Sequence, residues 1–196
     1  MSNFSCFPFL KLPFLPLQKV VHNLCCTEIT ELSLCSRRSK RLMQSIRHPE
    51  PTHIEITIDR RRMYVSLMHR FEVCSLWSII AEYEKRLLEF YRDDIIGGAS
   101  VRVMKLGDSR FNIDAPQQPE NAIKALVNHM KEVFKLPLIV DFRPNGMNDF
   151  LRFIPIFPVC KRFLLYGTEP ISSQELKYIE DNVVVEERYN CMIPVN

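Results

Sequence analysis

The chain has 196 residues, of which 46% are apolar and 25% are charged, so its length and composition suit one globular domain with a small additional module. Its 26 lysines and arginines against 23 acids give a net charge of +3, which is too small for the strong basic field of a dedicated nucleic-acid-binding protein. The seven cysteines are scattered and include no CxxC pair, which argues against a disulfide framework and against a zinc site of the usual ligand spacing.

The first apolar run, "FPFLKLPFLPL" at residues 7–17, looks like the hydrophobic core of a signal peptide. It lacks a basic start, however, and prolines and a lysine interrupt it. The chain also has no run of about 18 apolar residues that would span a membrane. We therefore expect no membrane association and a cytoplasmic or nuclear location.

Three short helices are expected within residues 16–48. The first is predicted by apolar residues at the i, i+3, i+4, i+7 spacing of one helical face, namely Leu17, Val20, Val21 and Leu24. Thr27 is suited to cap a second helix and Ser36 a third, because a hydroxyl can accept a bond from a free backbone N–H. The pair His48-Pro49 should end the third helix.

A basic run opens the third helix, formed by Arg37, Arg38, Lys40 and Arg41. The simplest interpretation is a solvated helix face that points away from the apolar residues of the same helix. A nuclear-import signal and a phosphate contact with nucleic acid are the alternatives. Residues 36–48 contain no aromatic side chain, so the segment does not support base stacking and leaves only phosphate contact with nucleic acid.

After a short proline-containing linker, strict alternation of apolar and polar residues predicts a strand at 53–58 and a second strand at 63–67, joined by a hairpin turn. Residues 76–91 have apolar side chains near helical spacing and predict an amphipathic helix. The segment 93–100 should break this helix. Two further strands are expected, at residues 100–106 and 110–114.

From Pro119 onward the sequence alternates between helical and extended patterns. The expected order is helix, strand, helix, strand, helix and strand over residues 119–134, 137–142, 147–154, 161–167, 172–182 and 183–189. The centres of the three strands lie about 22 to 25 residues apart, the period of leucine-rich-repeat-like units. The expected fold class is therefore α+β: an N-terminal three-helix module followed by an α/β region with weak leucine-rich-repeat-like strand–helix units.

Little in the chain points to catalysis. It has no GxGxxG, GxxxxGK[ST], HExxH or GxSxG motif, and its five histidines never fall at metal-ligand spacing. The acidic pairs Asp93-Asp94 and Glu186-Glu187 are adjacent in sequence, so their side chains should point apart. We expect a non-enzymatic protein without cofactor or metal.

The segment "LPFLPLQKVVHNLCCTEITELSLCSRRSKRL" resembles the F-box, a three-helix module that docks on the Skp adaptor of Skp–cullin–F-box ubiquitin ligases. The resemblance covers residues 7–48 and includes Leu12-Pro13, Glu28-Ile29 and "LSLCSRRSK", which is similar to the expanded nematode F-box set. Ser39 stands where many F-boxes have tryptophan. Residues 49–196 resemble an F-box-associated type 2 domain, but they are short for it, which suggests a truncated form.

This resemblance implies a substrate-recognition adaptor that binds Skp, and cullin through Skp, while its C-terminal domain presents an unidentified protein substrate for ubiquitination. The Skp-binding residues that it implies are Leu12, Pro13, Leu17, Val20, Val21, Leu24, Ile29, Leu32 and Leu34. Some of these side chains must instead pack within the module.

A physical argument also favours a partner, because three short helices bury too little apolar surface to be stable alone. One alternative is a basic-patch protein that binds nucleic acid or an import receptor through residues 37–41. A second is an F-box-like scaffold that binds Skp but has lost its cullin or its substrate.

Overall fold

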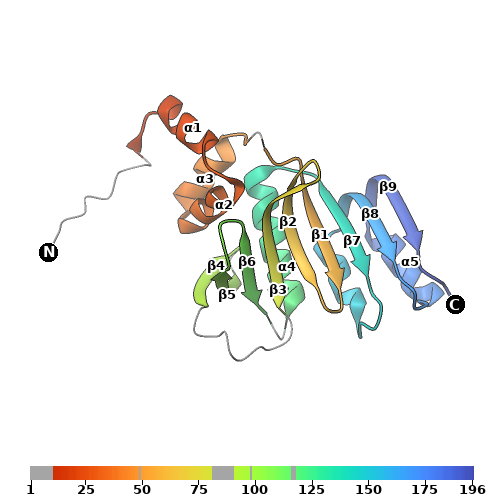
Figure 1. Ribbon diagram of the computed structural model, residues 1–196. Coiled ribbons are helices and arrows are strands. Elements are labelled where there is room, and N and C mark those ends of the chain that lie inside the picture. The colour runs from red at the N-terminus through yellow and green to blue at the C-terminus, as the bar shows by residue number, and fades with distance from the viewer. Residues whose placement is uncertain (1–10, 49, 81–90, 98, 116–117) are drawn as a thin grey trace.

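The computed structural model describes residues 11–48, 50–80, 91–97, 99–115 and 118–196. Three N-terminal helices lie beside a nine-stranded sheet, and further helices cover one face of that sheet (Figure 1). The fold is therefore mixed α/β, in agreement with the expected class. In the part of the chain that the structure describes, no helix is long and apolar enough to cross a membrane.

The three expected N-terminal helices are present: α1 (Phe14–His22), α2 (Cys26–Cys35) and α3 (Arg37–Ser45). We call them together the helical unit. Helix α1 begins before Pro16, which lies in the first turn, where the missing N–H of proline costs no helical hydrogen bond. Ser36 caps α3 as predicted, since its hydroxyl accepts a bond from the Ser39 N–H at 3.0 Å.

The predicted cap of α2 is wrong. Cys25 occupies the capping position, where its sulfur accepts from the Glu28 N–H at 3.5 Å and the Glu28 carboxylate accepts from the Cys25 N–H at 2.8 Å. Thr27 lies inside the helix, fully buried, and its hydroxyl has no hydrogen-bond partner among the described residues. The second hydrogen bond of this capping box, from the Cys25 N–H to the Glu28 carboxylate, favours Cys25 as the cap. If Thr27 were the cap, the third helical residue would be Thr30, which has no carboxylate to accept such a bond.

The sheet has the strand order β4-β5-β6-β3-β2-β1-β7-β8-β9. The strands are β1 (His53–Asp59), β2 (Met63–His69), β3 (Glu72–Ile80), β4 (Arg92–Ile96), β5 (Ala99–Lys105), β6 (Arg110–Asp114), β7 (Leu138–Arg143), β8 (Val159–Tyr166) and β9 (Val184–Met192). Pairing is antiparallel within β1-β2-β3 and within β4-β5-β6. It is parallel between β3 and β6 and along β1-β7-β8-β9.

The main core lies between the sheet and helix α4 (Pro119–Phe134), which runs behind the central strands (Figure 1). The alternation that predicted β1 places Ile54, Ile56 and Ile58 on one face, where all three are fully buried. On α4, Ile123 and Met130 are equally buried and belong to the same cluster. The body of the molecule is therefore a sheet closed on one face by an amphipathic helix.

The predicted helix over residues 76–91 is wrong for its first residues. Positions 76–80 belong to strand β3, in which Ser75, Trp77 and Ile79 face inward at a period of two. Trp77 stacks on Phe111 of β6, with ring centroids 4.1 Å apart, so the neighbouring strand decides the conformation here. Residues 81–90 of that prediction lie outside the described residues, and residues 93–96 of the predicted break belong to β4 (Arg92–Ile96).

The C-terminal elements alternate as expected. After β7 comes a 3-10 helix, η3 (Phe150–Ile156), which continues through Pro155 instead of ending before it; β8, α5 (Ser173–Asn182) and β9 follow. Proline is tolerated in so short a helix because few intrahelical donors are lost. The three strands β7, β8 and β9 lie in order and parallel, each connected to the next through a helix.

Candidate partner-docking site

Exposed apolar side chains gather where α1 begins. We call residues 12–15 the start segment. Phe14 is 54% and Leu15 70% exposed, Pro13 is exposed and Leu12 is half-buried. Val20, further along the helix, is also exposed. Exposing large apolar side chains to water costs free energy. A group of such side chains on the surface is typical of a site that a second molecule covers.

The other predicted Skp-binding residues are used inside the molecule. Leu17, Val21 and Ile29 are buried, and Leu24 is half-buried against the same cluster as Val21 and Ile29. Leu34 packs against the sheet core and Leu32 is half-buried. Val21, Leu24 and Ile29 therefore pack within the helical unit, whereas Pro13 and Val20 are exposed and Leu12 is half-buried.

Helix α4 supplies part of the surface that covers the helical unit. Val133 belongs to the same buried cluster as Val21, Ile29, Met43 and Ile46, and Phe134 packs against it. The sequence prediction divided these side chains between packing within the module and contact with a partner, and it did not consider cover from the distant Val133. The apolar surface of the helical unit that stays exposed lies at the start of α1 and at Val20.

Polar contacts also fix the helical unit to the body. The Lys40 ammonium lies 2.5 Å from the Glu132 carboxylate of α4, and Lys105 of β5 lies 2.8 Å from Glu31 of α2. Such partly exposed pairs each contribute little stability, but they restrict orientation. The helical unit that carries the start segment is therefore held in one orientation on the body.

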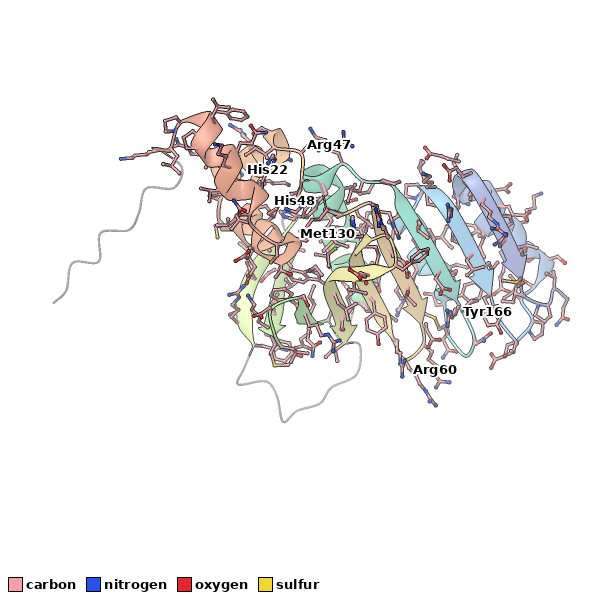
Figure 2. All side chains as sticks on the ribbon, turned by 45° about the horizontal axis from the view of Figure 1, so that its top comes forward. His22, Arg47, His48, Arg60, Met130 and Tyr166 are labelled. Carbon is pink, nitrogen blue, oxygen red and sulfur yellow. The ribbon has the colours of Figure 1, made fainter. Side chains whose placement is uncertain are left out.

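The basic run is divided by these contacts. Arg37, Arg38 and Arg41 are exposed, whereas Lys40 is half-buried in its ion pair. Arg47 and Arg60 lie on opposite sides of the molecule, the first beside the helical unit and the second at the β1–β2 turn (Figure 2). These two arginines therefore do not belong to one basic patch.

Sequence reasoning missed Phe14 and Leu15 because it started the first helix at Pro16. The signal was present in "FPFLKLPFLPL", a run too apolar for a solvated terminus and too interrupted for a signal peptide. Proline at both positions 13 and 16 suggested an irregular segment. Within the first helical turn, however, proline is well tolerated.

A second exposed apolar surface lies at the C-terminal edge of the sheet. Val184 is 62% and Met192 53% exposed on β9, and Tyr189 is also exposed. A shallow hollow beside them is lined by Ile179, Glu180, Val183, Val185 and Tyr189. Because β9 ends the strand order among the described residues, its outer edge is available for contact.

Comparison with known proteins finds a distant similarity to an uncharacterized protein. No family model matches the chain, and no solved structure matches it. The chain is 23% identical, over 200 aligned residues, to the uncharacterized protein F59B2.9 of Caenorhabditis elegans. The similarity covers 96% of this chain and 45% of that protein, so the chain spans less than half the length of this relative.

Proposed function

We propose that the chain is a non-catalytic adaptor of a Skp–cullin–F-box ubiquitin ligase, in which the helical unit is an F-box that binds the Skp subunit. The observation that carries the proposal is the exposed apolar start segment, with Phe14 and Leu15 presented on three helices that are fixed to an α/β body. The F-box-like residues Leu12-Pro13 belong to the same segment.

The energetics are adequate for docking. Full burial of a side chain such as Leu15 or Phe14 is worth about 1.5–3 kcal/mol, so a few contacts at the start segment and Val20 would offset part of the entropy of association. The residues buried within the helical unit would act indirectly, by holding the start segment in place.

The body would present the substrate. We assign that contact to the exposed side chains of β9 and the hollow between β9 and α5, in a region that we describe as leucine-rich-repeat-like. Ubiquitin transfer would occur on other subunits, and the adaptor would contribute proximity instead of a reacting group. Such a protein would work in the cytoplasm or the nucleus.

Co-expression tests this function. The full chain is produced with a Skp subunit and a cullin, and the complex is captured through a tag on the chain. We expect both partners to be retained at stoichiometric amounts. Capture of Skp without cullin would instead support a scaffold outside the ligase, and absence of Skp would refute the proposal.

The nucleic-acid alternative has its own measurement. A phosphate-binding protein loses oligonucleotide affinity steeply as salt rises, because each neutralised phosphate releases counterions. We expect binding to be absent or independent of salt. A steep salt dependence that disappears when Arg37 and Arg41 are changed to serine would favour the basic-patch function.

A further inference from the structure

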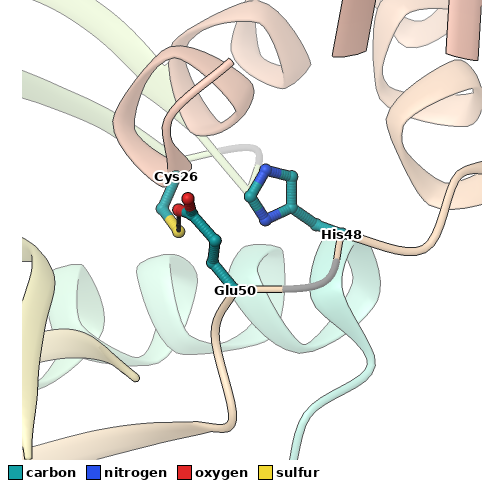
Figure 3. Close-up of side chains that lie close together, drawn as sticks. All are labelled: Cys26, His48 and Glu50. Atoms are coloured by element: carbon teal, nitrogen blue, oxygen red, sulfur yellow. Dashed lines mark hydrogen bonds between the residues drawn. The ribbon is translucent and has the colours of Figure 1, made fainter. Parts of the chain in front are cut away.

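Three side chains that could bind a metal, from helix α2 and from the connection after α3, meet beside the sheet. Cys26 is the first residue of α2, and His48 and Glu50 lie in the connection between α3 and β1. One ligand atom from each, the thiol sulfur, a ring nitrogen and a carboxylate oxygen, lie within 4.8 Å of one another. The three side chains converge on one point (Figure 3).

The hydrogen bonds of His48 identify which nitrogen is available. Its Nε2 lies 2.8 Å from the carbonyl oxygen of Leu24, and a carbonyl can only accept, so Nε2 carries the proton. In a neutral ring Nδ1 then holds a lone pair. Nδ1 is buried, and His48 as a whole is only 9% exposed. Among the described residues this nitrogen has no hydrogen-bond partner.

A buried lone pair without a donor is unfavourable, and a bound cation would satisfy it. The ring also has the arrangement usual for a metal ligand, in which the second nitrogen donates to a backbone carbonyl and so fixes the tautomer. The neighbouring atoms suit a cation as well. The Cys26 sulfur is fully buried and lies 3.9 Å from a Glu50 carboxylate oxygen.

The donor set selects the class of metal. Sulfur, imidazole nitrogen and carboxylate oxygen together favour zinc or a similar transition-metal ion, whereas calcium and magnesium favour oxygen alone. A further thiol lies near Cys26, because, after burial, Cys74 of β3 is among the groups that raise the pKa of the Cys26 thiol. Zinc is the member of this class that most often takes two thiolates with a histidine.

We propose that Cys26, His48 and Glu50 form a zinc site, with Cys74 as the nearest candidate for the fourth ligand. Donor atoms of a tetrahedral zinc site lie about 3.5 Å apart, so the three side chains must close by about 1 Å. On binding, the thiol proton leaves to solvent and the thiolate takes its place on the metal.

The ion would join α2, the α3–β1 connection and, through Cys74, strand β3. It would thus hold the helical unit against the sheet. The metal site does not rest on the adaptor function, since its ligands are distinct from the start segment. Zinc binding and Skp binding can therefore fail independently.

The test uses the full chain, stripped with a chelator under reducing conditions and then given Zn²⁺ in competition with a chromophoric chelator. We expect one zinc per chain. The Co²⁺-loaded protein should show thiolate-to-cobalt charge-transfer absorption, which reports sulfur ligation directly. A stripped protein that takes up no zinc, or whose Cys26 and Cys74 are joined in a disulfide under these conditions, would overturn the proposal.

Variants locate the site. Cys26→Ser and Glu50→Gln should each weaken zinc affinity by about 100-fold or more. Glu50 is exposed, so its substitution leaves folding intact even if the buried Cys26→Ser does not. The matched controls are Cys35→Ser, an exposed thiol on the same helix, and Glu72→Gln, an exposed acid on β3. Equal affinities in Glu50→Gln and Glu72→Gln would contradict the assignment.

Discussion

The hydroxyl oxygen of Ser33 in α2 lies 2.7 Å from Nε2 of His129 in α4 and joins the helical unit to the body through a buried hydrogen bond. The Ser33 hydroxyl itself donates to the carbonyl oxygen of Thr30 at 2.7 Å, so the oxygen accepts from the His129 N–H. Burial, followed by the nearby Lys40, lowers the pKa of His129 to about 4. The ring is therefore neutral at pH 7.

Stability should consequently fall on acidification. Because the pKa of His129 is lower in the folded chain than its usual value of about 6.5, the unfolded chain binds the proton first as the pH falls. The contribution of neutral His129 to the free energy of unfolding is fully present above about pH 6.5 and is lost toward pH 4. Between pH 7 and pH 5 the free energy of unfolding should fall by about 2 kcal/mol for this reason. Urea unfolding at the two pH values measures it. His129→Gln, which cannot titrate, should show a smaller difference, and an equal difference in both proteins would contradict this role.

The helical unit and the sheet should unfold together. Met43 is 2% exposed in the cluster shared with Val133, so Met43→Ala should cost about 2–5 kcal/mol. The single tryptophan, Trp77, reports on the sheet by fluorescence, and circular dichroism reports on the helices. We expect both signals to shift to the same lower midpoint. A Trp77 transition that stays at the wild-type midpoint would show that the helical unit unfolds alone.

The ion pair across the same interface should matter less. Lys40 and Glu132 are partly exposed, so Lys40→Met should cost under about 1 kcal/mol, and salt should reduce the cost further. Denaturation of this variant at low and high salt gives the value. A loss as large as that of Met43→Ala would mean that charge, not apolar packing, joins α3 to α4.

A hydroxyl in place of the Cys25 thiol should cap α2 more strongly and stabilise the chain. Sulfur is a weak acceptor, so Cys25→Ser should stabilise the chain by about 0.5 kcal/mol, while Cys25→Ala should destabilise it by up to about 1 kcal/mol. Thermal or urea unfolding of the two variants decides the order. Cys35→Ser, at the exposed end of the same helix, is the control and should change little. The reverse order for the two Cys25 variants would rule out the cap.

Local sequence patterns were sufficient to predict the elements whose conformation depends on residues near one another in the chain. The i, i+3, i+4 spacing of α1, the alternation of β1 and the apolar face of α4 each predicted the correct element. The prediction failed for residues 76–80, whose apolar residues fit a helix almost as well as a strand. There the strand conformation is favoured by pairing with β6, whose Phe111 stacks on Trp77. Phe111 lies far along the chain from Trp77, so the local sequence pattern does not reveal this contact.

The candidate sites were less predictable, because they depend on distant residues. Which apolar side chains stay exposed on α1 depends on how the helical unit packs on Val133 of α4. The proposed zinc ligands come from helix α2 and from the α3–β1 connection without any characteristic spacing, so a search for paired ligands in sequence does not find Cys26 with His48 and Glu50. Only the fold brings these side chains together.

The affinity of the full chain for purified Skp measures docking through the start segment. Phe14→Ala/Leu15→Ala should weaken binding about 100-fold, because both side chains lose apolar contact with the partner. Phe71→Ala/Ile95→Ala removes two apolar side chains at other places on the surface, 97% exposed for Phe71 and 65% for Ile95, and should leave the affinity unchanged. Equal affinities for the two double variants, or no binding of Skp by the wild-type chain, would contradict the account.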